Sequence, residues 1–251
     1  MSVLVDRGIL DAMVSGAIVI RPFDRACLGT NSYDVHLAPT LRVYKSGVER
    51  VDVVGGGSEM IDLLGPLDVR APRETVDVTI PEEGFVLEPG ELYLASTVEH
   101  TESREHVPVL NGRSSIGRLG LSIHVTAGTG DVGFRGCWTM ELFVIRRLRV
   151  YAGIPIGQLL WFTTDSAPLV PYGDKASAKY ADAGPLPMAS MLHAELKPAC
   201  KHVRIKTGGL VTTINRAWLV ETCLDCGATR TTNSRGSDPS AWATAGDGED
   251  D

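Results

Sequence analysis

Short runs of alternating apolar and polar residues, separated by glycine and proline, make up most of the chain after its first 32 residues. Residues 33–38 (YDVHLA) and 41–44 (LRVY) alternate with the period of two that a half-buried strand requires. Residues 85–94 predict two strands joined by a Pro-Gly turn, and residues 148–162 repeat this pattern. Many short strands with few helices indicate a mainly β fold, either a sandwich or a barrel.

Three other segments interrupt this strand pattern. A short helical pattern begins near Asp6 and continues to Val14, before Arg21-Pro22 ends it. Residues 51–67 contain three consecutive glycines, which predicts an exposed loop. Residues 166–190 are rich in alanine, glycine and proline, so we expect a mobile arm there.

The composition changes near residue 197 and divides the chain. We expect a β domain over residues 1–196, a small module over 197–235 and a disordered acidic tail over 236–251. The chain as a whole has a net charge of −7, which is not typical of a nucleic-acid-binding protein. Residues 197–235, in contrast, contain seven lysines and arginines and only two acidic residues.

The sequence gives no sign of secretion or membrane insertion. Asp6 interrupts the first ten residues, which argues against a signal peptide, and no segment approaches the ~20 apolar residues of a membrane span. Five cysteines without a secretion signal favour a reducing compartment over a disulfide framework. We therefore expect a cytoplasmic protein, from a bacterial or a virus-infected cell.

The residues with the strongest chemical signal lie between positions 111 and 142. Residues 113–118 (RSSIGR) combine two guanidinium groups and two hydroxyls, a donor set that suits phosphate oxygens. Asp131 lies in a glycine-flanked turn, and Glu141 lies in the apolar strand pattern TMELFVI. These three features also have simpler interpretations. Residues 113–118 could begin a helix capped by Ser114 or Ser115, Asp131 could be an ordinary turn aspartate, and Glu141 could be an outward-facing strand glutamate.

Several motifs of this region occur in the order and spacing of a known family. The strings RSSIGRLGL, HVTAG, GDVGF and TMEL resemble the dCTP deaminase branch of the dUTPase-like superfamily. Supporting matches are NSYDVHL (31–37), LEPGELYLAST (87–97), IGQLLWF (156–162) and the pair Lys179-Tyr180. The resemblance covers about the first three quarters of the chain. It implies a distorted jelly-roll that assembles as a homotrimer, with active sites between subunits.

The resemblance also assigns catalytic roles. Glu141 matches the general base that activates water for attack at C4 of cytosine, a role for which partial burial of a carboxylate is suitable. Ser114 and Arg118 match the residues that orient this water and support the developing charge. In HVTAG, His124 is expected to be structural, while the Ala127 backbone is expected to contact the water.

Further positions match the nucleotide-binding residues of the family. Arg113, Ser115 and Lys179 are expected to hold phosphates, and Asp131, Gln158 and Tyr172 to hold the sugar and base; Ile116, Gly117, Thr139 and Met140 complete this predicted set. The chain departs from the family pattern at Thr129, Gly130 and Ala183, where larger residues or a glutamine are usual. These departures concern the grip on the phosphates rather than the central site.

The C-terminal module contains a second constellation. Cys200 and His202 form one close pair, and Cys223 and Cys226 form another roughly twenty residues later. Four such ligands make a closed tetrahedral zinc site, and the residues between them predict strands, as in a small zinc ribbon. The alternative is two unrelated thiols and a surface histidine. A module of this size would depend on the metal for much of its folding energy.

These observations predict an enzyme that converts dCTP to dUTP and ammonia. Mg²⁺ is expected to accompany the triphosphate, and zinc is expected to be structural. Two alternatives remain open at this stage. The same scaffold could act as a dUTP diphosphatase, or as a bifunctional enzyme that releases dUMP. The chain could instead be a non-catalytic nucleotide-sensing or nucleic-acid-binding protein, with the basic module as its contact surface.

Overall fold

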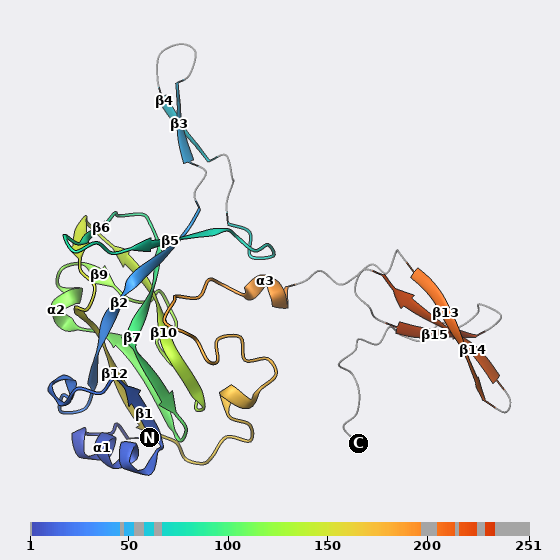
Figure 1. Cartoon of the computed structure of the whole chain (residues 1–251), viewed down its shortest axis with the longest axis horizontal. Coiled ribbons are helices and arrows are strands. Elements are labelled where there is room, and N and C mark those ends of the chain that lie inside the picture. The colour runs from blue at the N-terminus through green and yellow to red at the C-terminus, as the bar shows by residue number, and fades with distance from the viewer. Residues whose placement is uncertain are drawn as a thin grey trace. The chain divides into compact units, whose positions relative to one another are not determined.

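A computed structural model describes residues 2–45, 48–52, 58–62, 67–196, 205–213, 216–224 and 229–233 (Figure 1). The chain forms two units, Met1–Leu192 and His193–Asp251, each of which is described by itself. The boundary lies a few residues before the one expected from composition.

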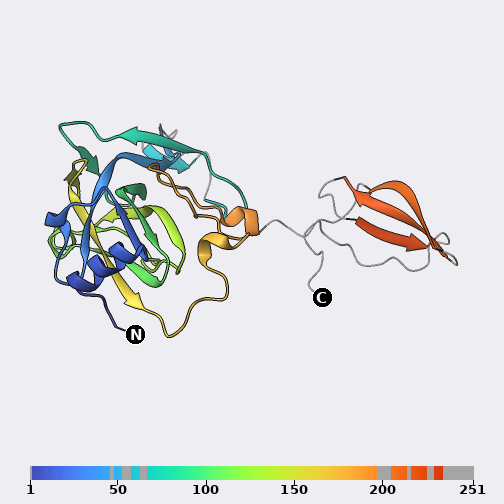
Figure 2. The same cartoon turned by 60° about the horizontal axis from the view of Figure 1, so that its bottom comes forward.

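An eight-stranded antiparallel sheet forms the larger unit. Its main path has the order β8-β12-β2-β7-β10-β9, and β1 and β5 pair beside it with β7 and β2 respectively. The strands are β1 (Ile18–Arg21), β2 (Tyr33–Tyr44), β5 (Thr75–Thr79), β7 (Tyr93–Ser103), β8 (His106–Gly112), β9 (Leu121–Ser122), β10 (Phe134–Val144) and β12 (Pro155–Thr163). The sheet curves strongly on itself, as Figure 2 shows, so the expected mainly β, barrel-like architecture is confirmed.

Two small sheets accompany the large one. β6 (Phe85–Leu87) pairs with β11 (Leu148–Val150), and β3 (Val48–Asp52) pairs with β4 (Ser58–Asp62). The two strands expected on either side of the Pro-Gly turn therefore exist as β6 and β7, but they do not pair with each other. The expectation of a loop over residues 51–67 was wrong for the described strand residues, and residues 53–57 and 63–66 lie outside the described ranges.

The core lies inside the curved sheet. Tyr33, Val35 and Leu37 of β2 are essentially buried, while the residues between them are half-exposed, as the alternating sequence predicted. Met140 and Leu142 of β10 and Trp161 of β12 are also fully buried. The alternation has a direct consequence for the site, because it turns Thr139 and Glu141 to the opposite face of β10 from Met140 and Leu142.

Helices are few and short. α1 (Asp6–Ser15) confirms the predicted N-terminal helix; it ends at Gly16, whose left-handed backbone (φ 80°) lets its N–H bond to Met13 O. The remaining elements are η1 (Arg25–Cys27), α2 (Ser114–Gly117), η2 (Tyr172–Asp174) and α3 (Leu192–Glu195). α2 has Arg113 at its N-cap with no side-chain capping bond, so the alternative interpretation of Ser114 or Ser115 as a helix cap was wrong.

Residues 172–188 bond to β10 and the loop before it at several points instead of extending away from the sheet. The Tyr172 N–H donates to Val132 O at 2.8 Å, and the Cys137 N–H donates to Ala183 O at 2.8 Å. The Met188 N–H donates to Thr139 Oγ1 at 3.0 Å. This part of the predicted arm is thus placed against β10, and its mobility in solution stays a prediction.

The smaller unit contains one antiparallel sheet, in the order β13 (Ile205–Thr213), β14 (Arg216–Cys223), β15 (Thr229–Asn233). Cys223 is the last residue of β14, whereas Cys200, His202 and Cys226 lie outside the described residues. The acidic tail over 236–251 lies outside them as well. Within the described ranges, no helix is long and apolar enough to cross a bilayer.

Candidate active site

A cavity of about 620 Å³ opens between β10, the loop that precedes it and the segment after β12. Its lining brings together five residues of the predicted site, from three separate stretches of chain. They are Ala127, Asp131, Thr139, Glu141 and Tyr172. A cavity of this size suits a nucleotide-sized ligand, since small-molecule sites usually occupy about 300–1,000 Å³.

Glu141 lies on the wall of this cavity and is half-buried. One of its carboxylate oxygens, Oε2, accepts a hydrogen bond from the Val125 N–H at 3.0 Å. The Glu141 N–H in turn donates to Ile123 O at 2.9 Å. The stretch that precedes Ala127 therefore fixes the carboxylate. Glu141 thus faces away from the core, as the simpler interpretation has it, but its side chain lies on a cavity wall and is held by a backbone N–H.

The loop that contains Asp131 is held on both sides. The Phe134 N–H donates to Asp131 O at 3.0 Å, and the Gly133 N–H donates to Ser103 O at 2.6 Å. Gly133 has a left-handed backbone (φ 94°), and a Cβ there would lie 2.7 Å from Pro171 Cβ. The glycine after Asp131 is thus needed for the close approach of residues 171–173, which bring Tyr172 to the same cavity.

Two aromatic rings form a wall of the cavity that the sequence did not reveal. Phe134 and Trp138 pack with ring centroids 4.6 Å apart, and Trp138 Nε1–H donates to Thr101 Oγ1 at 2.9 Å. A Cβ at Gly130 would lie 2.5 Å from Trp138 Cη2. The glycine that departs from the family pattern therefore makes room for a tryptophan eight residues later.

Tyrosines from distant parts of the chain also line the cavity. The Tyr172 hydroxyl accepts the Tyr180 N–H at 3.0 Å, and the Tyr44 hydroxyl accepts the Ser190 N–H at 2.9 Å. Tyr44 was not predicted as a site residue, because nothing near it in sequence marks the loop that it meets 146 positions later.

The predicted phosphate cluster lies elsewhere on the same unit. None of the described residues that line the cavity belongs to the 113–118 stretch, and Gln158, Met140 and Lys179 are also missing from the lining. Arg113 pairs with Asp34 at 3.1 Å, and Gln158 is the strand neighbour of Asp34. Arg118 Nη1 lies 3.4 Å from Ser114 Oγ. The cluster is therefore a second group of polar residues, separate from the Glu141 cavity.

Apolar side chains are exposed near this second group. Leu119 follows α2, and Phe143 and Ile145 lie at the end of β10, where it pairs with β9; all three are exposed. Val125, which holds Glu141, is exposed as well. A surface that combines unpaired apolar side chains with polar residues is typical of a protein–protein contact.

Comparison with known proteins places the chain in a family. The model of the dCTP deaminase-like family matches residues 3–164. The chain belongs to the dCTP deaminase-like family. Among curated proteins, it is 44% identical over 163 residues to "dCTP deaminase, dUMP-forming" of Cytophaga hutchinsonii, covering 65% of this chain and 82% of that one. It is 46% identical over 144 residues to the protein of that name from Clostridium acetobutylicum, covering 57% of this chain and 73% of that one.

Solved structures of two kinds resemble this chain. One is a 2'-deoxycytidine 5'-triphosphate deaminase from Agrobacterium tumefaciens, at 18% identity and a TM-score of 0.44, covering 64% of this chain and 48% of that one. Another is the dUTPase of Staphylococcus bacteriophage 80alpha, at 14% identity and a TM-score of 0.35, covering 61% of this chain and 94% of that one.

The family model ends at residue 164, before the arm and the C-terminal unit. The dCTP deaminase-like part therefore contains Glu141, Ala127, Asp131 and Thr139, whereas Tyr172 and Tyr180 belong to the segment that follows it. Within the described residues, no group of three histidine, cysteine or carboxylate side chains is arranged to hold a metal ion. The predicted zinc ligands lie largely outside those residues and stay a prediction.

Proposed function

We propose that this protein deaminates dCTP hydrolytically. The observation that supports this most directly is the cavity that joins Glu141, Asp131, Thr139 and the Ala127 backbone within a dCTP deaminase-like domain. Water adds to C4 of the cytosine ring, and the amino group then leaves as ammonia, which converts the base to uracil. Glu141 accepts the proton of the attacking water and returns it to the departing nitrogen.

The geometry around Glu141 supports this role. The Val125 N–H holds one carboxylate oxygen, so the carboxylate has a defined position against a bound base. Ala127 lies two residues further along the same stretch and also lines the cavity. Its backbone can orient the attacking water beside Glu141. Phe134 and Trp138 add an aromatic wall to the same cavity.

We adopt dUMP as the final product. The sequence alone favoured release of dUTP and kept the bifunctional alternative open. The similar curated proteins from Cytophaga hutchinsonii, Clostridium acetobutylicum and Leptospira biflexa are all named dUMP-forming, which favours that alternative. The cavity offers a second carboxylate, Asp131, to activate water for attack at the α-phosphate. The overall products are then dUMP, pyrophosphate and ammonia.

We further propose that the complete site forms between subunits of a homotrimer. Within one chain, the donors of the 113–118 stretch and the Glu141 cavity are separate, yet the reaction needs phosphate-binding groups beside the base. The exposed apolar residues Leu119, Phe143 and Ile145 lie near both groups. Contact between copies would cover this surface, so that Ser114 and Arg118 of one copy approach Glu141 of the next.

Mg²⁺ fits the proposed reaction as a companion of the triphosphate. Magnesium usually binds to proteins through one or two carboxylates together with substrate phosphates. Asp131 is the cavity carboxylate that could hold a complex of magnesium and triphosphate, because Glu141 is assigned to proton transfer at the cytosine ring. The ion would neutralise phosphate charge while the residues of this chain position the nucleotide.

We also propose that the C-terminal unit binds one structural zinc ion, because its sequence contains four residues that commonly ligate zinc. Cys200, His202, Cys223 and Cys226 would supply the four ligands that a tetrahedral zinc site needs, and Cys223 ends a strand of a small three-stranded sheet. Such zinc would stabilise the unit, whose contact with nucleic acid remains an additional hypothesis. Substitution Cys223→Ser should remove about one zinc per chain and leave deamination nearly unchanged. Zinc retained by this variant, or deamination that requires zinc, would contradict the assignment.

The function is tested by product analysis. The purified protein is incubated with dCTP and Mg²⁺, and ammonia, pyrophosphate, dUTP and dUMP are quantified over time. Equal amounts of ammonia and pyrophosphate, with dUMP as the nucleotide product, support the bifunctional reaction. Ammonia with dUTP alone would restrict the activity to deamination. Release of neither product would favour a binding function.

A further inference from the structure

Residues 171–183 are attached to the start of β10 at two points. At the first, the Tyr172 N–H donates to Val132 O, and the Gly173 N–H donates to Gly133 O at 3.2 Å. At the second, the Asp182 N–H donates to Arg135 O at 2.9 Å, and Ala183 forms a parallel bridge with Gly136. The stretch between these two points is held to the sheet at both of its ends.

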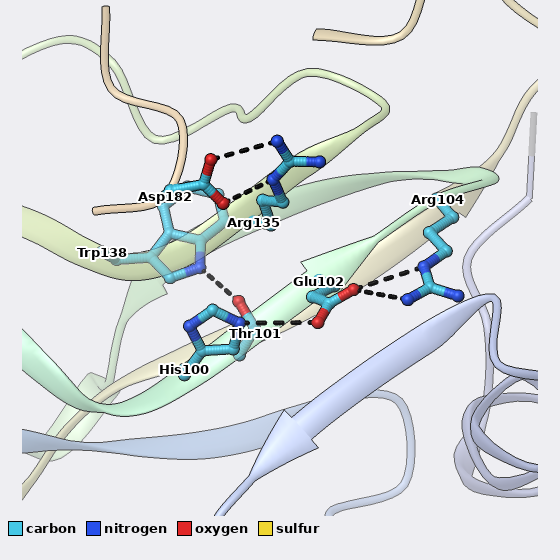
Figure 3. A network of polar contacts seen from close by, with 7 residues as sticks. All are labelled: His100, Thr101, Glu102, Arg104, Arg135, Trp138 and Asp182. Atoms are coloured by element: carbon cyan, nitrogen blue, oxygen red, sulfur yellow. Dashed lines mark hydrogen bonds and ion pairs between the residues drawn. The ribbon is translucent and has the colours of Figure 1, made fainter. Parts of the chain in front are cut away.

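One side chain contacts both attachment points. Arg135 Nε donates to Asp182 Oδ1 at 2.5 Å, and Nη2 donates to Oδ2 at 3.0 Å, which makes a two-pronged ion pair (Figure 3). Nη2 also lies 3.5 Å from Gly173 O. The guanidinium lowers the pKa of the Asp182 carboxyl below its ordinary value, mainly through this hydrogen bond. Planar guanidinium–carboxylate pairs of this kind add directional specificity that a lysine would not supply.

The backbone is adapted to the second attachment. Asp182 has a left-handed backbone (φ 58°), a conformation that aspartate and asparagine tolerate better than most residues. Gly136 has φ 143°, and a Cβ there would lie 2.7 Å from Ala183 N. Asp182 and Gly136 both have positive φ and lie at the same contact. The close approach of residues 182–183 to β10 therefore depends on residues of both segments.

The attachment shapes the substrate cavity. Tyr172, Tyr180 and Ala183 line the cavity, and the Tyr172 hydroxyl accepts the Tyr180 N–H. Arg135 itself does not line it; it faces a separate depression of about 360 Å³ with Glu102, Arg104 and Asp174. Arg135 therefore acts on the cavity only through the segment that it holds.

We propose that Arg135, through its ion pair with Asp182, is a positioning residue that holds Tyr172 and Tyr180 in the wall of the nucleotide site. Its effect on substrate rests on the proposed function, whereas its effect on the segment does not. Loss of the ion pair should let residues 171–183 open more often. The nucleotide would then bind more weakly, while the reacting groups at Glu141 stay in place.

A neighbouring ion pair provides a matched control. Arg104 donates to Glu102 at 2.7 Å, and Glu102 also lies 3.6 Å from His100. Figure 3 shows this pair close to Arg135 on the same face, and both arginines line the smaller depression. Arg104 and Glu102 pair with each other rather than with Asp182. The substitution Arg104→Ala therefore removes a similar charge without removing a link to the segment.

The first measurement is hydrogen–deuterium exchange of the full chain without nucleotide. In Arg135→Ala and in Asp182→Asn, amides of residues 171–183 should exchange roughly two- to five-fold faster, the range expected for loss of an exposed ion pair. Asparagine keeps a residue that tolerates the left-handed backbone, so Asp182→Asn tests the charge rather than the fold. Peptides from β8 and β12 should exchange as in the unaltered protein, which verifies folding. Unchanged exchange in both variants, or equal acceleration in Arg104→Ala, would overturn the proposal.

The second measurement is steady-state kinetics with dCTP. Arg135→Ala and Asp182→Asn should raise KM by roughly two- to five-fold with kcat within a factor of about two, because the ion pair holds binding groups and not the base. The double variant should resemble either single variant, since both remove the same pair. Effects that multiply in the double variant, or a fall in kcat without a rise in KM, would overturn the proposed role. A protein without dCTP activity would contradict the proposed function and leave the exchange result intact.

Discussion

At the scale of single residues, backbone contacts decide what Glu141 can do. Its carboxylate accepts the Val125 N–H, and that stretch leads directly to Ala127, so one short segment links the proposed base to the proposed water-orienting backbone. A carboxylate held in this way loses little freedom when the substrate binds, which favours proton transfer from a bound water.

The substitution Glu141→Gln tests this assignment. Glutamine keeps an acceptor oxygen for the Val125 N–H, so the variant should fold and bind dCTP. It cannot accept the proton of water, so deamination should fall by at least ~10²-fold. Ammonia release measures the rate, and Glu91→Gln, at an exposed position after the Pro89-Gly90 turn, is the control. Near-normal turnover in Glu141→Gln would rule out its role as the base.

His106 supplies a prediction about pH. Its Nδ1 is buried without a partner among the described residues, and burial lowers the pKa of its imidazole in the folded protein. The folded state therefore favours neutral His106, and its contribution to stability is complete above the unfolded pKa of about 6.5. As the pH falls below that value, this contribution declines until the lower folded pKa is passed.

The comparison of His106→Phe with the unaltered protein isolates this effect. Urea unfolding at pH 7.5 and 5.5 should show that the unaltered protein loses more stability than the variant. For a single titrating group, the free energy of unfolding cannot change with pH by more than about 1.4 kcal/mol per pH unit, which limits the difference between the two proteins. Equal pH dependence in the two proteins would show that His106 is not linked to unfolding.

At the scale of elements, the loop before β10 packs against the strand because a small residue of the loop faces a large residue of β10. Gly130 leaves room for Trp138, whose indole is fixed by Thr101. A residue with a side chain at position 130 would push against a buried ring that cannot move without breaking this bond. The glycine at position 130, where larger residues were expected from the resemblance, thus fits the local packing around Trp138.

The substitution Gly130→Ala should destabilise the protein by about 1–3 kcal/mol, as overpacking of a dense region usually does. Adding Trp138→Leu should reduce this penalty, because the added methyl group then no longer meets the indole and keeps only its contact with Pro108 Cγ at 3.1 Å. Gly184→Ala is the control, since nothing lies within 4 Å of a Cβ there. Urea unfolding of the single and double variants measures the coupling. Strictly additive losses would mean that the two positions do not compete for space.

At the scale of the whole molecule, the separation of the 113–118 stretch from the Glu141 cavity leads to the proposal of a shared site. If the site forms between copies, two inactive variants can complement each other. In a homotrimer mixed at random from equal amounts of Arg118→Ala and Glu141→Gln chains, about one quarter of the sites would combine two intact contributors.

Co-expression and purification of the mixed protein measure this directly. Each variant alone should be nearly inactive, and the mixture should regain up to roughly a quarter of the unaltered activity. Solution mass should correspond to three chains. An active monomer, or a mixture as inactive as its components, would show that one chain supplies the whole site.

The sequence by itself determined the local features of this protein. The alternating runs predicted the strands, the helical pattern near Asp6 predicted α1, and the motifs between positions 111 and 142 indicated the family, in which Glu141 is the proposed base. These features depend on side-chain periodicity or on residues close together in the chain. Local patterns of this kind are present in the sequence before any long-range contact forms.

The tertiary structure alone decided which segments meet. β6 pairs with β11 rather than with β7, Tyr44 meets Ser190, and Arg135 meets Asp182, although nothing near any of these residues marks its partner. Strand pairing and arm docking depend on how the whole sheet closes around its core, and many pairings satisfy the same alternating pattern. The position of the cavity that Glu141 lines follows from that closure, because its walls come from segments that are far apart in sequence.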